Sequence, residues 1–377
     1  MNLQVLSALS KDLGNLGASS RLRTLIRRSG VDFASNDYLG LARSDVLVVA
    51  ARDALERGVA LGSGGSRLLR GNDPEHEALE GEAAALFGVE AALSFPTGYT
   101  ANAALLSTLP QRGDLILHDN LIHASSHEGM RLSRAIHQGF RHNDVDHCAH
   151  LLSEWRSSGG MGTAWLLVES LYSMDGDVAP LADFQALANG QGAMLVVDEA
   201  HATGVIGPQG KGLAATLPHR DNVITLHTFG KALGCEGAVL CGPAIMRDFL
   251  INRGRSFIFS TAPSPLMAAV ARAALAHVAD ADDLQARLQQ RVSQAESLLS
   301  QIGIAPSGSQ IIPVVIGDDR AAMEAARTIQ AAGYDVRGIR PPTVPEGTAR
   351  LRISITLNAS EADIAGLAAC LASMWQR

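Results

Sequence analysis

The stretch LVVDEAHATGVIG, residues 195–207, decides the fold class of this chain. It is a continuous apolar run that ends at Asp198 and then turns through small residues. Continuous rather than alternating hydrophobicity is typical of a strand buried on both faces, as in a parallel sheet. Asp198 therefore stands at the carboxyl end of a buried strand, where open α/β sheets bind their ligands.

Similar apolar runs precede and follow this stretch. Together with it, they predict strands at residues 91–95, 114–119, 163–170, 193–200, 222–228 and 237–242. Helical patterns such as EHEALEGEAAALFG (75–88) lie between them, and the closing Gly88 suits a helix C-cap. This alternation of strands and helices predicts an α/β fold with a doubly wound, mainly parallel sheet.

The pattern changes after FSTAPSP (259–265). A long Ala/Gln-rich helix is predicted from about residue 265 to 301, followed by a strand, a helix, two strands and a closing helix. We therefore expect an N-terminal helix and extended segment at 1–45, a large α/β domain at 46–264 and a smaller α+β domain at 265–377.

Composition excludes several classes of protein. The 377 residues are 47% hydrophobic and 18% charged, which permits a large core and argues against disorder. A net charge of −7 argues against a general nucleic-acid binder. The four cysteines form no CxxC pair, so we expect reduced thiols. No signal peptide and no apolar window of about 18 residues is evident, so we expect a soluble, cytoplasmic protein without a membrane span.

The segment TLHTFGKALGCEGA (225–238) places Lys231 directly after an apolar strand. Burial lowers the pKa of a lysine and favours a nucleophilic amine, although an ordinary surface lysine is the simpler interpretation of this segment alone. His201 follows Asp198 in the letters DEAH, which suggest a helicase. A helicase needs a GxxxxGK[ST] phosphate loop, and the sequence has none. Glu236, beyond the lysine turn, is expected to face solvent.

Three other segments are weaker signals. SFPTGYTAN (94–102) puts Gly98 and Tyr99 at a strand-to-helix turn, which can cradle an anion. HDNLIHASSHEG (118–129) carries three histidines but neither HExxH nor a carboxylate set, so we expect no metal and a single functional histidine. GSGGSRLLRGN (62–72) lacks the register of a dinucleotide site. Pyridoxal phosphate (PLP) would use the lysine, the aspartate, the anion cradle and a flat side chain together.

The motifs SNDYLGL, GSGGSR, ESLYSMDGD, VVDEAHATGVIG and HTFGKALG occur in this order over nearly the whole chain. In this the sequence resembles the α-oxoamine synthases, fold-type I PLP-dependent transferases that join an acyl-CoA to an amino acid with loss of CO2. The stretch IRPPTVPEGTARLR (339–352) most resembles the branch that condenses L-alanine with a pimeloyl thioester in biotin biosynthesis.

The resemblance implies a role for each matching cofactor residue. Lys231 would form the Schiff base and later move the α-proton, and Asp198 would pair with the pyridine nitrogen. His201 and Ser173 would bond the ring oxygen, and His123 would stack on the ring. The phosphate would be bound by Gly98, Tyr99 and Thr228. Ser260 and Thr261 would reach it from a second subunit, which implies a homodimer with shared active sites.

On the substrate side, the resemblance implies that Arg352 clamps the amino acid's carboxylate. Arg340, Thr343 and Asn36 would line the same pocket, with Arg21 or Arg23 contributing from the N-terminal segment. Two alternatives stay open. One is another α-oxoamine synthase that uses glycine or serine, such as a 2-amino-3-ketobutyrate CoA ligase. The other is a non-catalytic PLP-binding protein. Whether the acyl group arrives on CoA or on an acyl carrier protein (ACP) is also open.

Overall fold

The computed structural model describes residues 4–375, and contacts within it divide the chain into two compact units. The larger unit comprises residues 39–173 and 177–286. The smaller unit comprises the chain up to Tyr38, the short segment Met174–Gly176 and the chain from Arg287 onward. No helix within residues 4–375 is long and apolar enough to cross a membrane.

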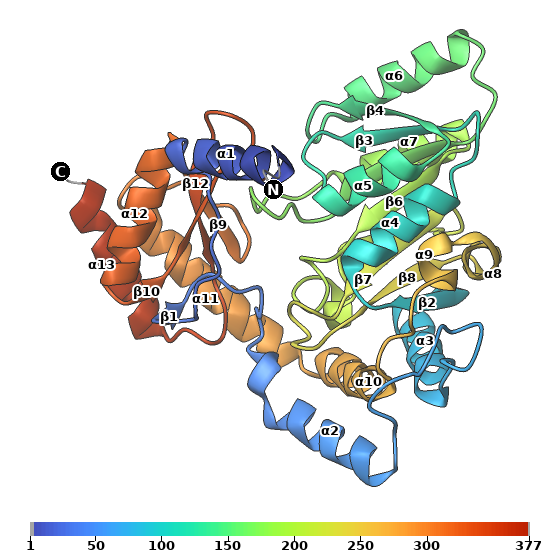
Figure 1. Cartoon of the computed structure of the whole chain (residues 1–377), viewed down its shortest axis with the longest axis horizontal. Helices are drawn as coiled ribbons and strands as arrows, with labels where there is room; N and C mark the ends of the chain where they lie inside the picture. Colours follow the sequence, from blue (N-terminus) through green and yellow to red (C-terminus); the bar gives the residue numbers. More distant parts are fainter. Residues whose placement is uncertain (1–3, 376–377) are drawn as a thin grey trace. The chain divides into compact units, whose positions relative to one another are not determined.

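The larger unit is built on a seven-stranded sheet with strand order β2-β8-β7-β6-β5-β3-β4 (Figure 1). Its strands are β2 (Ala91–Phe95), β3 (Leu115–Asp119), β4 (Ile136–Phe140), β5 (Ala164–Glu169), β6 (Met194–Asp198), β7 (Val223–Thr228) and β8 (Ala238–Gly242). All neighbouring pairs are parallel except the two that β8 makes with β2 and β7. The mainly parallel sheet is therefore confirmed.

The apolar runs arise because both faces of this sheet are covered. In β6, Leu195 and Val197 pack into one hydrophobic cluster, whereas Val196 between them packs into the other. The sequence analysis missed β4, because its residues Ile136 to Gln138 are exposed and do not form an apolar run.

Helices supply these two layers. The larger unit contains α2 (Asp45–Glu56), α3 (Pro74–Phe87), α4 (Gly98–Thr108), α5 (Ala124–Leu132), α6 (Val145–Ser157), α7 (Leu181–Gln191), α8 (Ala244–Arg253), α9 (Arg255–Ile258) and α10 (Pro265–Asp280). Helix α3 ends at Gly88 in the left-handed conformation, φ 63°, which confirms the predicted C-cap. Helix α4 begins after Thr97, whose hydroxyl accepts the N–H of Thr100.

The smaller unit contains a three-stranded antiparallel sheet of order β11-β12-β9 and a two-stranded pair of β1 with β10. Its elements are α1 (Gln4–Ala18), β1 (Val31–Asp32), β9 (Ile311–Gly317), α12 (Asp319–Ala331), β10 (Tyr334–Asp335), β11 (Arg337–Ile339), β12 (Ala349–Ser354) and α13 (Glu361–Trp375). The sequence predicted two strands between the last two helices, and the structure has three, because the segment 334–339 forms two short strands, β10 and β11.

The division between the units differs from the expected boundary at residue 265. Helix α10 packs against α2 and α3, so it belongs to the larger unit. The expected single helix from 265 to 301 is two helices, because α10 ends at Asp280 and α11 (Asp282–Ser300) begins after Ala281. The acidic pair Asp282 and Asp283 then lies in the first turn of α11, where the helix dipole favours negative charge.

Candidate active site

Asp198 is held at the carboxyl end of β6 by two hydrogen bonds. The side-chain amide of Asn102, on α4, donates to Asp198 Oδ2 at 2.7 Å, and the backbone N–H of Ala200 donates to Oδ1 at 2.9 Å. The same amide of Asn102 donates to Ser125 Oγ at 3.1 Å, and that hydroxyl lies 2.8 Å from His123 Nδ1. A polar chain therefore connects Asp198 to His123 through α4 and the start of α5.

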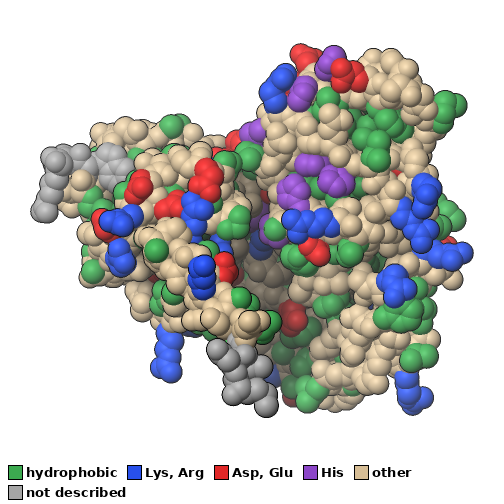
Figure 2. All heavy atoms as spheres, turned by 45° about the horizontal axis from the view of Figure 1, so that its top comes forward, with side chains coloured by type: hydrophobic (Ala, Val, Ile, Leu, Met, Phe, Trp, Pro, Cys, Tyr) green, Lys and Arg blue, Asp and Glu red, His purple; other side chains and the backbone are tan. Residues whose placement is uncertain are grey.

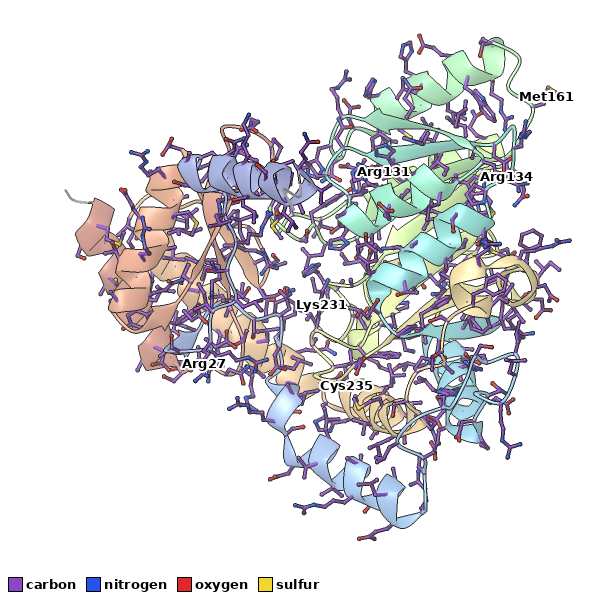
Figure 3. The ribbon with its side chains drawn as sticks, in the orientation of Figure 1. Arg27, Arg131, Arg134, Met161, Lys231 and Cys235 are labelled. Atoms are coloured by element: carbon purple, nitrogen blue, oxygen red, sulfur yellow. The ribbon has the colours of Figure 1, made fainter. Side chains whose placement is uncertain are left out.

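Lys231 lies in the loop between β7 and β8 (Figure 3). Its charge acts on His123. Desolvation lowers the pKa of His123. The charge of Asp198 raises it, and the charge of Lys231 lowers it further. An amine, a carboxylate and an imidazole thus meet at one edge of the sheet. The whole sequence has only three lysines, Lys11, Lys211 and Lys231.

Glu169 is a further carboxyl group at this edge, which the sequence analysis did not single out. It ends β5 and pairs in register with Asp198 on β6. Its Oε2 accepts the backbone N–H of Ser173 at 3.1 Å, and its pKa is raised to about 8, first by burial and then by the charge of Asp198. This bond fixes the backbone of Ser173 to Glu169, the residue paired with Asp198.

The start of α4 and the end of β7 lie side by side at the place where the sequence predicts an anion cradle. The first residues of a helix leave backbone N–H groups without partners inside the helix. A Cβ added to Gly98 would lie 3.5 to 3.7 Å from Leu226 and Thr228, so Thr228 stands beside this helix start. Tyr99 follows on α4 and is 48% exposed.

The remaining cofactor candidates divide into two groups. His201 is buried in the turn that follows Asp198, on the same loop as the site. Ser260 and Thr261 follow α9 and lie against a different segment, because the N–H of Ala262 donates to Gly65 O at 2.9 Å. The Ser260 hydroxyl donates to Thr261 O at 3.3 Å.

In the smaller unit, Arg352 on β12 is buried and oriented by two neighbours. Its Nη1 donates to Ser354 Oγ at 2.7 Å and its Nη2 to the hydroxyl of Tyr38 at 3.2 Å. The Tyr38 hydroxyl in turn donates to Asn36 Oδ1 at 3.0 Å. The structure therefore joins the predicted residues Arg352 and Asn36 through Tyr38, a residue of the SNDYLGL motif to which the sequence analysis gave no role.

Arg23, Thr343 and Arg340 gather in another part of the smaller unit. Arg23 Nη2 lies 3.4 Å from Thr343 Oγ1, and Arg340 Nη2 donates to Leu22 O at 2.8 Å. The buried Nε of Arg340 meets no acceptor in the described chain. Burial, together with the charge of Arg23, lowers the pKa of Arg340. Two cations so close together favour an anion between or beside them.

Arg21 differs from this group. Its Nε pairs with Asp319 Oδ2 at 2.6 Å, and its Nη1 and Nη2 donate to Glu346 at 2.8 and 2.5 Å. Both sides of the guanidinium are thus engaged by carboxylates of this chain. Of the two N-terminal arginines that the sequence left open, we therefore retain Arg23 as the candidate for substrate binding.

Histidines gather on one face of the larger unit (Figure 2). The rings of His118 and His127 are 5.2 Å apart edge to face, and His137 lies 6.1 Å from His118. Within residues 4–375, however, no group of three or more His, Cys, Asp or Glu side chains has an arrangement that could hold a metal ion. Glu236 is exposed beyond the lysine turn, as expected.

These side chains fit pyridoxal phosphate. Asp198 is a buried carboxylate already oriented by donors, as a pyridinium nitrogen requires, and Lys231 supplies an amine near it. Gly98 opens α4, where backbone N–H groups without partners inside the helix can bind a phosphate. Each requirement of the cofactor therefore has a candidate in the larger unit.

Comparison with known proteins agrees with this assignment. Residues 28–369 match the family Aminotransferase class I and II. An 8-amino-7-oxononanoate synthase of Anaeromyxobacter dehalogenans is 43% identical over 350 residues, which cover 92% of this chain and 87% of that protein. The serine palmitoyltransferase of S. paucimobilis, solved with a bound PLP–myriocin aldimine, matches with a TM-score of 0.90 at 25% identity, over 99% of this chain and 98% of that one. An 8-amino-7-oxononanoate synthase from Francisella tularensis matches with a TM-score of 0.77 at 26% identity, over 92% and 98%.

Fold and site together define a PLP-dependent enzyme of fold-type I. The chain belongs to the aminotransferase class I and II family and, within it, to the 8-amino-7-oxononanoate synthase family, whose members are PLP-dependent acyltransferases. The resemblance inferred from the motifs, the fold class and the cofactor are therefore confirmed.

Proposed function

We propose that this enzyme condenses L-alanine with a pimeloyl thioester, carried by CoA or by an acyl carrier protein. The products are 8-amino-7-oxononanoate, CO2 and the free thiol, so the reaction would belong to biotin biosynthesis in the cytoplasm. The observation that carries the proposal is the meeting of Lys231, Asp198 and His123 at one sheet edge, in a chain 43% identical to an 8-amino-7-oxononanoate synthase.

PLP, when bound, supplies a conjugated ring that accepts the electron pair left on the α-carbon, first when its proton is removed and later when its carboxylate leaves as CO2. Asp198 would balance the charge of the pyridine nitrogen, and the bond from Asn102 fixes the orientation of its carboxylate. His123 would cover one face of the ring, while Ser173 and His201 would bond its oxygen. Thr228 and the first N–H groups of α4 would bind the phosphate.

Lys231 would act as the base that removes the α-proton of alanine and as the acid that later returns a proton to the same carbon. The carbon freed of its proton attacks the thioester carbonyl, the C–S bond breaks and the thiol leaves. The bond to the alanine carboxylate then breaks and releases CO2. Both proton transfers take place at the same carbon, so one lysine can serve both.

Arg352 would hold the alanine carboxylate with its planar fork, which Ser354 and Tyr38 orient. Asn36 would complete this pocket through the Tyr38 hydroxyl. Arg23 and Arg340 are cations near Thr343, and an anionic part of the acyl substrate would satisfy their charge.

We further propose that the enzyme works as a homodimer whose partner supplies Ser260 and Thr261 to the phosphate. Two observations support a second copy. Phe259, next to these residues, is 73% exposed, and Val5, Leu9 and Leu13 of α1 expose 54 to 68% of their surface. Exposed apolar side chains of this size favour burial against another chain.

The experiment is thiol release from pimeloyl-CoA by the PLP-loaded enzyme, with L-alanine, glycine and L-serine compared. Alanine-dependent release supports the proposal. Release with serine alone would favour the second candidate, an acyltransferase that uses serine, which the TM-score of 0.90 to a serine palmitoyltransferase keeps open. If no amino acid gives release from pimeloyl-CoA, the assay is repeated with pimeloyl-ACP, and silence there too would contradict the proposal.

A further inference from the structure

Glu169 occupies an unusual position for a carboxyl group. It ends β5 in register with Asp198 on β6, and only 3% of its surface is exposed. Its Oε2 accepts the N–H of Ser173 at 3.1 Å. Its Oε1 is buried and meets no hydrogen-bond donor within residues 4–375.

A buried carboxylate with a bare oxygen is costly if it is ionised. Four charged or polar neighbours face Glu169, each from a different segment. The charge of Asp198 favours the neutral acid, whereas Lys231 and the backbone N–H groups of Ser173 and His123 favour the ionised form. Burial and Asp198 prevail, and the pKa of Glu169 is raised to about 8, so the neutral acid predominates at pH 7.

The carboxylate of Asp198 is in the opposite situation. It receives hydrogen bonds from the side chain of Asn102 and from the N–H of Ala200, one to each oxygen. Hydrogen bonds of this kind stabilise the charged form. The two acids are neighbours across the ladder but differ in how their oxygens are satisfied: each oxygen of Asp198 accepts a hydrogen bond, whereas Oε1 of Glu169 accepts none within residues 4–375.

We propose that Glu169 is a positioning residue of the cofactor site that acts as a neutral carboxylic acid, anchoring Ser173 while leaving Asp198 as the single negative charge at these strand ends. A proton on Glu169 removes the negative charge that its Oε1, without a donor, could not stabilise. The neutral acid can still accept the Ser173 N–H, and it adds no second negative charge beside Asp198. This inference rests on the cofactor site, but its test reads the proton on the chain itself, so it can fail while the proposed reaction stands.

The test compares wild type with Glu169→Gln, because glutamine is the uncharged isostere of the acid. In the cofactor-free protein, infrared spectroscopy is expected to show a protonated-carboxyl band that the substitution removes and that disappears in wild type with a midpoint near pH 8. The variant is expected to bind PLP within about threefold of wild type at pH 7, since both keep an acceptor for Ser173. Glu169→Ala, which loses that acceptor, is expected to bind at least tenfold more weakly.

Glu199 provides the matched control. It is also fully buried, but its oxygens accept from Ser170 Oγ at 2.5 Å and from the N–H groups of Leu213 and Ala214 at 3.2 and 2.5 Å. In Glu199→Gln the new amide would face backbone donors, so this variant is expected to melt at a lower temperature than Glu169→Gln. Failure of Glu169→Gln to fold, tenfold weaker PLP binding by it, or no band that depends on Glu169 would each overturn the proposal.

Discussion

The side-chain amide of Asn102 lies 2.7 Å from Asp198 Oδ2 and so joins the middle of α4 to the end of β6. Asn102 is almost fully buried on a helix whose neighbouring residues are mostly apolar. The bond fixes the orientation of the carboxylate that we propose to pair with the cofactor, before the cofactor binds. Preorganisation of this kind lowers the free-energy cost of binding.

Replacing Asn102 by alanine is therefore expected to weaken PLP binding by about 10- to 100-fold, because a hydrogen bond to a charged group contributes roughly 1.5–3 kcal/mol. The measurement is a PLP titration followed by absorbance. Asn222→Ala is the control, because its amide donates to Asn189 Oδ1 and Ala193 O just before β7, at the opposite end of the strand from Thr228. Equal affinities for Asn102→Ala and wild type would refute the role of this bond.

Reduction of the PLP-loaded enzyme with borohydride is expected to fix the cofactor on Lys231 and on neither of the other two lysines. Peptide mass mapping checks this, and with only Lys11 and Lys211 as alternatives the answer is unambiguous. Lys231→Ala is expected to bind PLP without the visible absorbance of a lysine adduct, whereas Lys211→Ala keeps it. A labelled Lys211 peptide would show the assignment to be wrong.

Arg352→Lys keeps a positive charge but loses the planar fork, so it is expected to raise KM for the amino acid about 10- to 100-fold. PLP absorbance should stay unchanged, because Arg352 is oriented by Ser354 and Tyr38 of the smaller unit and is assigned to the substrate rather than to the cofactor. Arg337→Ala is the control, since Arg337 pairs with Asp335 in the same unit. A loss of cofactor with KM unaltered would speak against substrate binding by Arg352.

His142 is expected to make stability depend on pH. Burial opposes its protonation, but hydrogen bonds to Asp119 at 2.9 Å and Asp177 at 2.7 Å raise its pKa to about 10. A raised histidine pKa stabilises the fold fully below the unfolded value near 6.5, and that contribution is lost as pH rises through 10.

Urea unfolding at several pH values tests this with His142→Gln. The stability difference between wild type and variant is expected to be largest below pH 6.5 and to shrink steadily towards pH 10. The control is His150→Gln, on the exposed histidine that lies 3.3 Å from Glu154. A difference that stays constant from pH 6 to about 10 would contradict the ionic role of His142.

The sequence predicted the central sheet well because strands buried on both faces leave continuous apolar runs. It failed at β4, whose first residues are exposed, and at the break between α10 and α11, where Asp282 restarts a helix in an otherwise helical pattern. Strand ends, and with them Asp198 and Lys231, could be located because each follows an apolar run directly.

The supporting residues were harder to find from the sequence. Asn102, Ser125 and Tyr38 act through partners distant in the chain, and periodicity carries no information about such pairs. A polar residue on the mostly apolar helix that holds Asn102 was the one available signal. Arg21 is a residue that the sequence did propose as a substrate contact. Its bonds to Asp319 and Glu346, which argue against that role, join residues about 300 positions apart and leave no local pattern.

The most direct test of the proposed reaction uses L-alanine labelled in its carboxyl carbon, with a pimeloyl thioester and the PLP-loaded enzyme. We predict one labelled CO2 for each thiol released, and an amino ketone product without the label. Retention of the label in the product, or release of thiol without labelled CO2, would contradict decarboxylative condensation by this enzyme.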